Sequence, residues 1–252
     1  MLGQVLPAEA FGFILVLMRL SPLVMLMPVF GDRSIPQRIR VSFAFVLSLI
    51  IYAVHAGRLP PMPEGMFGLV TLLVQELLIG SMLALTARIL LSATHTAGTV
   101  IAFQTGLAAA QSFDPAQGAQ SVIVASFVSL TAITMIVATD LHHLMIQGFA
   151  YSYIKFPAGE VIPYEDFATL IVRYVADSFA LGFQLASPFI VYSLIFNLSL
   201  GLVARMVQGF QVFFIGMPMN LFVGFVLMLM LIGPMMSLFL EHFQQHLLSY
   251  LG

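Results

Sequence analysis

Long apolar runs separated by short polar segments dominate the sequence. A helix that crosses a bilayer core ~30 Å thick needs about 20 apolar residues. The runs that approach or exceed this length are 11–30, 41–56, 66–91, 121–139, 141–156, 178–204 and 210–240. The pattern predicts an all-α, polytopic membrane protein built from helical hairpins, with six spans, or seven if 141–156 crosses independently.

The run 210–240 is the longest and carries no charge. At 1.5 Å per residue a helix of this length reaches roughly 46 Å, which exceeds one bilayer core. We therefore expect this segment to tilt steeply, to break near Gly216 and Pro218, or to leave the hydrocarbon layer.

The linkers between the runs indicate an orientation. Residues 31–40 carry Arg33, Arg38 and Arg40, and basic loops are enriched on the cytoplasmic side. Residues 155–166 form the most acidic linker, which suits the outer face. Because no linker is long enough to fold separately, residues 1–252 are expected to form a single membrane domain.

Composition narrows the class of protein further. Apolar residues make up 60% of the chain and charged residues 8%, against about 45–50% and about 25% in soluble domains. So few charges cannot form a water-facing surface, and a formal net charge of −2 offers no basic patch for nucleic acid. The chain also lacks cysteine and the common hydrolase, metalloprotease and phosphate-loop motifs. We expect no enzyme, cofactor or metal.

A stripe of small residues follows the third apolar run. Gly98, Ala102, Gly106 and Ala110 recur every four residues, which places them on one face of a helix. Such stripes let helix backbones approach closely inside membranes. We expect close helix packing here.

Beyond the stripe the sequence predicts an end to the helix. Pro115 disfavours helical geometry at Asp114, and Phe113 and Gly118 flank this pair. A non-helical segment between apolar hairpins is expected to line an interface or a cavity rather than lipid.

Charged residues inside the apolar runs are candidates for function. Glu76 and Arg88 share a helix face with Gly80 but lie ~18 Å apart along it, so they cannot pair with each other. We expect each to pair with a charge on a neighbouring subunit, with a proton relay as the alternative. Arg19 and Arg205 have the same status.

The histidines suggest chemistry less strongly. Asp140, His142 and His143 are close in sequence, but adjacent side chains on a helix point about 100° apart, and no third ligand is evident. We expect a hydrogen-bonding or packing role at the water boundary. His242 and His246 lie among polar residues, which is typical of a solvated helix end.

Short pieces with recognisable residues follow one another in a fixed order along the chain. They are Arg19, 28–31, 35–40, 76–80, Gly98, 104–106, 114–115, 142–143, Ser152, 157–159, 186–188, Asn197, Gly201, Arg205 and 213–218. This ordered series resembles the FliR family of flagellar biosynthetic proteins and their type III secretion counterparts. The family commonly has a Pro-Gln pair shortly after the arginine that matches Arg205, whereas this chain has Gln208-Gly209.

The resemblance implies a structural and gating subunit of the flagellar protein export channel. Its expected partners are FliP-like and FliQ-like subunits, an FlhB-like subunit, membrane lipid and the unfolded rod, hook and filament proteins that the channel passes. The expected location is the bacterial inner membrane, within the flagellar basal body. Family helices form bent hairpins, and much of the gate rises above the membrane plane, so a long helix such as 210–240 need not match a bilayer.

The resemblance also assigns a role to the predicted break. The matching loop of the family is a plug inside the gate, which here implies a closing element formed by Gly106, Ala110, Phe113, Asp114, Pro115 and Gly118. From the residues alone, a static turn between two hairpins remains the alternative.

A secondary transporter coupled to protons or ions is the alternative function. Transporters of that kind often contain inverted repeats, and none is evident in this sequence. Packing or inter-subunit contacts are expected of Arg19, Glu76, Gly80, Arg88, Gly98, Ala102, Arg205, Gly216 and Pro218.

Overall fold

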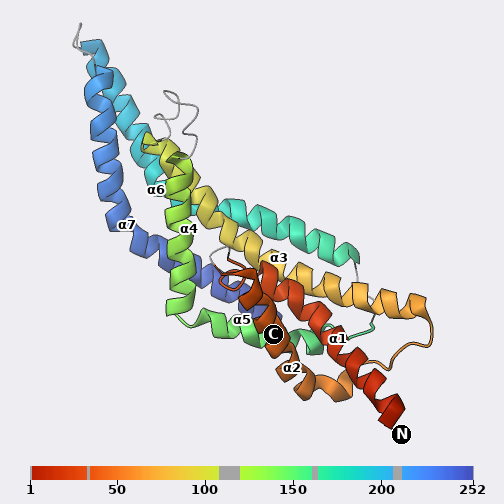
Figure 1. Cartoon of the computed structure of the whole chain (residues 1–252). Coiled ribbons are helices and arrows are strands. Elements are labelled where there is room, and N and C mark those ends of the chain that lie inside the picture. The colour runs from red at the N-terminus through yellow and green to blue at the C-terminus, as the bar shows by residue number, and fades with distance from the viewer. Residues whose placement is uncertain (1, 33–34, 108–119, 161–163, 207–211, 252) are drawn as a thin grey trace. The chain divides into compact units, whose positions relative to one another are not determined.

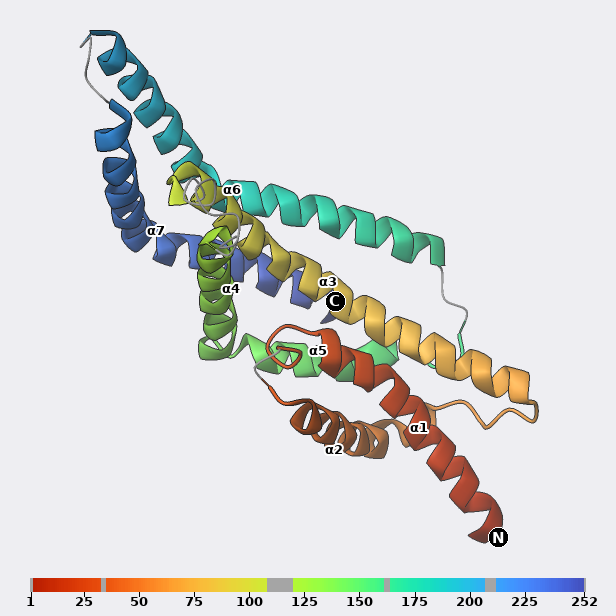
Figure 2. The same cartoon turned by 45° about the horizontal axis from the view of Figure 1, so that its top comes forward.

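The computed structural model describes residues 2–32, 35–107, 120–160, 164–206 and 212–251. These ranges contain seven α-helices, one short 3-10 helix and no strand (Figures 1 and 2). The elements are α1 (Leu2–Leu26), α2 (Gln37–His55), η1 (Ala56–Arg58), α3 (Met66–Gln104), α4 (Gln120–Ala138), α5 (Leu141–Lys155), α6 (Tyr164–Met206) and α7 (Val212–Leu251). The prediction of an all-α fold is confirmed.

Five of the described helices are long and apolar enough to cross a membrane. They contain the stretches Pro7–Leu26, Gln37–Arg58, Met66–Gln104, Phe167–Met206 and Ile215–Ser249. Helices α4 and α5 form a bent pair that qualifies as a further span. The expectation of a polytopic membrane protein is confirmed, and 141–156 is paired with the preceding run rather than crossing independently.

Helix α3 is longer than the hydropathy pattern indicated. It continues past residue 91 to Gln104 and has 39 residues, because no proline interrupts it. Helix α6 likewise begins at Tyr164, before the apolar run at 178–204, and has 43 residues. Hydropathy marked where lipid can surround a helix, not where the helix ends.

Helix α7 corrects another expectation. It has 40 residues and runs through both Pro218 and Pro234, so no break occurs near Gly216. Each proline removes one backbone hydrogen bond and favours bending. The apolar length of α7 nevertheless remains one continuous helix.

The chain divides into two units of dense internal contact. The first contains Met1–Leu90, Ile136–Tyr174 and Phe243–Gly252, and the second contains Leu91–Met135 and Val175–His242. Helices α3, α4, α6 and α7 contribute residues to both units. The expectation of one membrane domain stays a prediction.

In the first unit, α1 and α2 pack side by side (Figures 1 and 2). Leu15, Val16 and Leu20 of α1 are fully buried, and Phe149 of α5 is buried against Phe30 with ring centroids 6.4 Å apart. This apolar packing surrounds the polar cluster described next.

Candidate functional site

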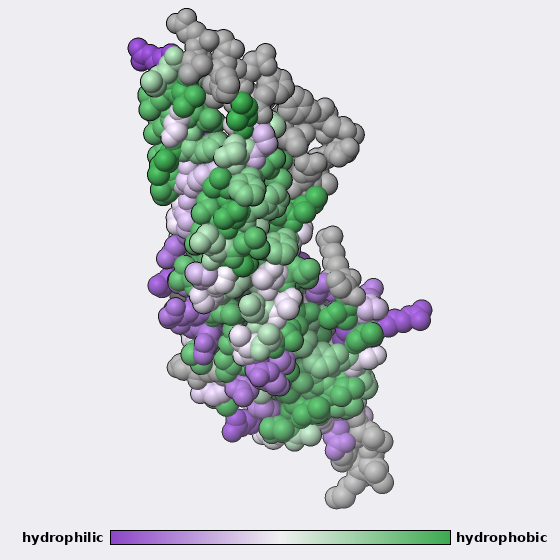
Figure 3. Space-filling view, turned by 90° about the vertical axis from the view of Figure 1, so that its left-hand side faces the viewer, coloured by the Kyte–Doolittle hydropathy of each residue, from purple (hydrophilic) through white to green (hydrophobic). Residues whose placement is uncertain are grey.

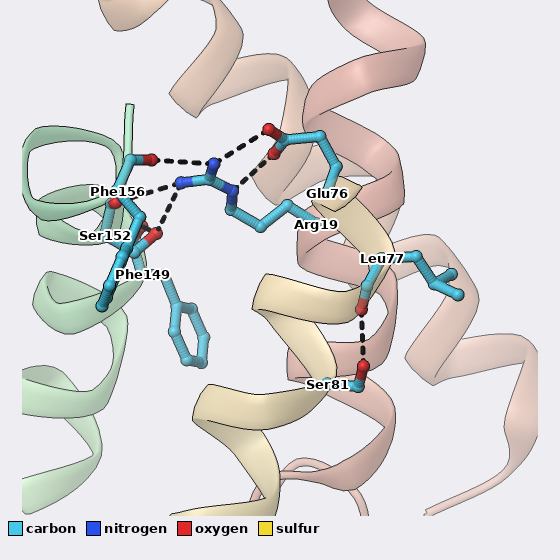
Figure 4. Close-up of polar contacts among 7 residues, drawn as sticks. All are labelled: Arg19, Glu76, Leu77, Ser81, Phe149, Ser152 and Phe156. Atoms are coloured by element: carbon cyan, nitrogen blue, oxygen red, sulfur yellow. Dashed lines mark hydrogen bonds and ion pairs between the residues drawn. The ribbon is translucent and has the colours of Figure 1, made fainter. Parts of the chain in front are cut away.

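The first unit contains a buried ion pair between two helices. Arg19 of α1 and Glu76 of α3 both have fully buried side chains. Arg19 Nε donates to Glu76 Oε2 at 2.5 Å, and Nη2 donates to Oε1 at 2.9 Å (Figure 4). Two parallel hydrogen bonds of this kind fix the orientation of both groups. The pair therefore holds α1 against α3.

The rest of the guanidinium reaches the end of α5. Arg19 Nη1 donates to the backbone oxygen of Ser152 at 3.0 Å and to its Oγ at 3.4 Å, and Nη2 donates to the Phe156 oxygen at 2.9 Å (Figure 4). The centroid of the Tyr153 ring lies 4.0 Å from Arg19 Cζ. Arginine has five N–H donors, and all five are used here.

The position of these oxygens explains why a cation is stable here. Ser152 and Phe156 lie at the C-terminal end of α5, where the helix dipole places a partial negative charge that attracts cations. The carboxylate of Glu76 supplies the full compensating charge. These residues join three helices. We call them the charge cluster (Arg19, Glu76, Ser152, Tyr153 and Phe156).

Gly80 lies one helical turn after Glu76, at the same α1–α3 contact. A Cβ atom at Gly80 would overlap the backbone oxygen of Arg19 and would lie 2.9 Å from Pro22 Cγ. Only glycine lets the two backbones come this close. The small residue thus brings Arg19 within reach of Glu76.

The expectation that Arg19 and Glu76 pair with a neighbouring subunit is wrong. They pair with each other across 57 residues of sequence, a match that no local pattern could reveal. Arg88 differs, because it is exposed and its Nη1 lies 3.4 Å from the Leu26 backbone oxygen. Arg205 is exposed in the last turn of α6. For these two, an inter-subunit role stays a prediction.

Glycines also set close contacts within the second unit. A Cβ at Gly98 would lie 2.5 Å from the Ala125 Cα of α4, and one at Gly182 of α6 would lie 3.0 Å from the Ala93 oxygen. Ala102 is fully buried. The α3 segment of this unit is therefore in backbone contact with both α4 and α6.

Helix α3 ends earlier than the small stripe predicted. Its last residue is Gln104, and Gly106 has a positive φ of 79°. A glycine in this conformation is a common terminator just beyond a helix end. The expectation that Gly106 continues the helical stripe is wrong. The other residues of the predicted closing element, Ala110, Phe113, Asp114, Pro115 and Gly118, lie outside the described residues.

Asn220 of α7 contacts this helix end and has no counterpart in the sequence predictions. Its Nδ2 donates to the Gln104 backbone oxygen at 3.3 Å, and a Cβ at Gly106 would lie 3.1 Å from the same nitrogen. Nearby, a Cβ at Gly216 would lie 2.8 Å from Leu200 Cδ1 of α6. Pro218 is exposed. An amide inside the uncharged run 210–240 was the available sequence signal for Asn220.

The histidine group is closer together than expected. The His142 and His143 rings have centroids 4.1 Å apart, and Asp140 Oδ1 lies 3.5 Å from His143 Nδ1. One ligand atom from each of the three lies within 4.8 Å of the others, so this group could hold a metal ion. Asp140 precedes α5 with a left-handed backbone, with φ of 60°, and the expectation that no metal binds here stays a prediction. The positive end of α5 opposes a cation there.

The C-terminal histidines differ from each other. His246 is buried, and its ring packs edge-on against Tyr174 with centroids 4.3 Å apart. His242 is half-buried, and its Nδ1 lies 2.9 Å from the Leu238 backbone oxygen of its own helix. The expectation of a solvated helix end is wrong for His246, because aromatic packing covers it.

Comparison with known sequences identifies the group to which this architecture belongs. The sequence model of the family described as "Bacterial export proteins, family 1" matches residues 10–246. The flagellar biosynthetic protein FliR of Caulobacter vibrioides is 40% identical over 231 residues, which cover 92% of each chain. FliR of Bacillus subtilis is 32% identical, with 86% of this chain and 85% of that protein covered.

A third relative, FliR of Escherichia coli, is 31% identical over 94% of this chain and 89% of its own length. Matches of this extent do not favour the secondary transporter. They agree with the apolar helices of the described ranges and with the resemblance carried by the motifs. The chain therefore belongs to the FliR family of bacterial export proteins and is a membrane-embedded subunit of the flagellar protein export apparatus.

Proposed function

We propose that the chain is a structural and gating subunit of the export channel, in which a rigid helical scaffold carries a closing element. The observation that carries this proposal is the charge cluster, which ties α1, α3 and α5 together with all five arginine donors used. Helix α3 continues from this cluster to Gln104, directly before the proposed closing element at 106–118.

A non-enzymatic role fits the chemistry of the charge cluster. Arg19 and Glu76 are fully buried and satisfy each other, so neither is available to a substrate. Catalytic groups must be reachable and poised for proton transfer. The charges inside this bundle serve packing.

Partner subunits and lipid account for the exposed apolar side chains. Figure 3 displays apolar residues over much of one face, and on α6 and α7 the exposed examples include Leu202 at 66% and Leu229 at 80%. Exposed apolar area on this scale marks a protein or membrane contact. We assign it to FliP-like, FliQ-like and FlhB-like subunits and to the bacterial inner membrane, with residues 1–252 acting as one membrane domain.

The closing element can be tested by deletion. Removing residues 112–116 is expected to leave the complex assembled while making the membrane permeable to ions and small solutes, because Phe113 and Pro115 are lost. Growth inhibition and dye entry in cells expressing the assembled complex measure the leak. Ser112→Ala, which alters a small polar side chain only, serves as the matched control and should stay tight.

Two outcomes distinguish a plug from a static turn. A leak from the deletion variant, with normal complex yield, supports a plug. A membrane as tight as wild type, with the complex present in normal amount, would show that 106–118 is a static turn.

A further inference from the structure

The second unit contains a pocket of about 300 Å³ beside the end of α3. Residues of α6 and α7 complete its wall, and its volume is at the lower end of the range for ligand pockets. We call it the amide pocket. Its wall combines amide side chains, two phenylalanines and glycines, among them Gln104, Asn197, Asn220, Phe103, Phe196 and Gly216.

Asn220 leaves a hydrogen-bonding group unsatisfied in this wall. Its Nδ2 is used by the Gln104 backbone oxygen, whereas its Oδ1 is buried and has no hydrogen-bond partner among the described residues. A buried acceptor without a donor costs about 1–3 kcal/mol. In native structures such a group calls for a specific explanation, for example a functional role or an ordered water.

Asn197 offers a second acceptor in the pocket, and its side chain is exposed whereas the Asn220 oxygen is buried. Its Nδ2 donates to the Ser193 backbone oxygen at 2.9 Å and to Ser193 Oγ at 3.1 Å. These bonds orient the side chain and direct both amide hydrogens to its own helix. The exposed side chain therefore presents its Oδ1 as an oriented acceptor for an N–H group from outside.

The pocket selects a neutral ligand. The residues that line it carry no charge, so neither an ion nor a phosphate is compensated there. Phe103 and Phe196 supply apolar surface. A peptide group has one N–H donor and one C=O acceptor, which match amide side chains.

Building on the proposed function, we propose that the amide pocket binds the extended main chain of the polypeptide being exported. An export channel must accept chains of different sequence, and the backbone is the feature they share. Main-chain hydrogen bonds to oriented amides are independent of sequence, while the phenylalanines tolerate many side chains. Binding of this kind is weak at each position and lets the chain move on.

Photocrosslinking in the assembled complex tests the contact. A photoreactive phenylalanine analogue replaces Phe196, and an exported protein fused to a fast-folding domain is arrested in the channel. Crosslinks to the arrested chain are expected for two exported proteins of unrelated sequence. The matched control places the analogue at Leu229 of α7, which lines an apolar groove with Ile123 and Phe127 instead.

The partner of the crosslink decides the outcome. Crosslinks from position 196 to the arrested chain, several-fold stronger than from position 229, support the proposal. Crosslinks only to another gate subunit, or only within this chain, would overturn it, since the pocket would then be a packing surface.

Export rates supply an independent measurement. Asn197→Leu keeps the size of the side chain and removes the acceptor, and we expect export to slow about three- to tenfold, the equivalent of one hydrogen bond. Ser199→Ala is the control, because that exposed hydroxyl bonds the Ile195 oxygen of its own helix. An unchanged export rate for Asn197→Leu in a normally assembled complex contradicts the proposal.

The two hypotheses fail in different ways. If the deletion of 112–116 leaks but position 196 never reaches the arrested chain, the gating role stands and the amide pocket does not bind substrate. If position 196 crosslinks to the arrested chain and the deletion stays tight, the pocket stands and the plug fails.

Discussion

Glu76→Gln isolates the contribution of the buried charge. The substitution keeps the shape of the side chain and one acceptor oxygen but leaves the Arg19 guanidinium, which is fully buried, without a counter-charge. Breaking a buried ion pair by removing one partner costs about 3–5 kcal/mol. The equilibrium constant for folding should therefore fall by a factor on the order of 10² to 10⁴.

A companion variant shows whether charge or packing is responsible. Arg19→Met combined with Glu76→Met removes both charges and keeps apolar volume, and such replacements are often neutral or even stabilising. The three carbonyl and hydroxyl acceptors on Ser152 and Phe156 would lose their donor, so we expect the double variant to be weaker than wild type yet clearly more stable than Glu76→Gln.

Thermal survival is the appropriate assay. The chain has no tryptophan, so a fluorescent-protein fusion is heated in detergent and the intact fraction is measured by size-exclusion chromatography. Ser81→Ala is the matched control on α3, because the Ser81 hydroxyl bonds the Leu77 oxygen of its own helix at 2.6 Å (Figure 4). It should change stability by less than about 0.5 kcal/mol.

The reasoning is refuted by one specific pattern. If Glu76→Gln survives heating as well as wild type and Ser81→Ala, then Arg19 does not depend on this carboxylate. If the double variant is less stable than Glu76→Gln, the cluster acts through hydrogen bonding to α5 rather than through charge compensation.

Further substitutions test the close contacts and the exposed charge. Gly80→Ala should destabilise the protein by about 1–3 kcal/mol through overlap with the Arg19 backbone. Gly148→Ala, at a position where no described atom lies within 4 Å, should stabilise α5 by about 0.5–1 kcal/mol. Thermal survival of the two variants is compared, and equal effects would contradict the close contact at Gly80. Gly106→Ala should lose about 1–2 kcal/mol at its positive φ, and Gly106→Asn should lose less, by the same assay. Arg205→Glu should leave the thermal survival of the single chain unchanged but reduce co-purification of partner subunits, and normal complex yield would count against an inter-subunit role.

The sequence alone determined the class of protein. Apolar runs near 20 residues and a charged fraction of 8% admit only helices in a membrane-like environment, because an unpaired backbone cannot cross hydrocarbon. The order of short motifs indicated the family, which the comparisons bear out. These signals are local or additive along the chain, so no tertiary information was needed.

Helix boundaries were harder to predict from the sequence. The apolar run stopped at residue 91, and the stripe of small residues indicated a helix from Gly98 but extended it to Ala110, past the observed end. The end at Gln104 depends on Gly106 adopting a positive φ, and glycine by itself permits either conformation. The contact with Asn220 helps to select one of them.

Only the tertiary structure decided what the buried charges do. Arg19 and Glu76 are 57 residues apart, and Ser152 is 133 residues from Arg19. The pattern around each residue showed that a charge was buried but not which partner would meet it. That choice depends on the close approach at Gly80 and on the direction in which α5 ends. Both arise when distant segments pack, because the free energy of a buried charge is set by the atoms around it and not by its neighbours in sequence.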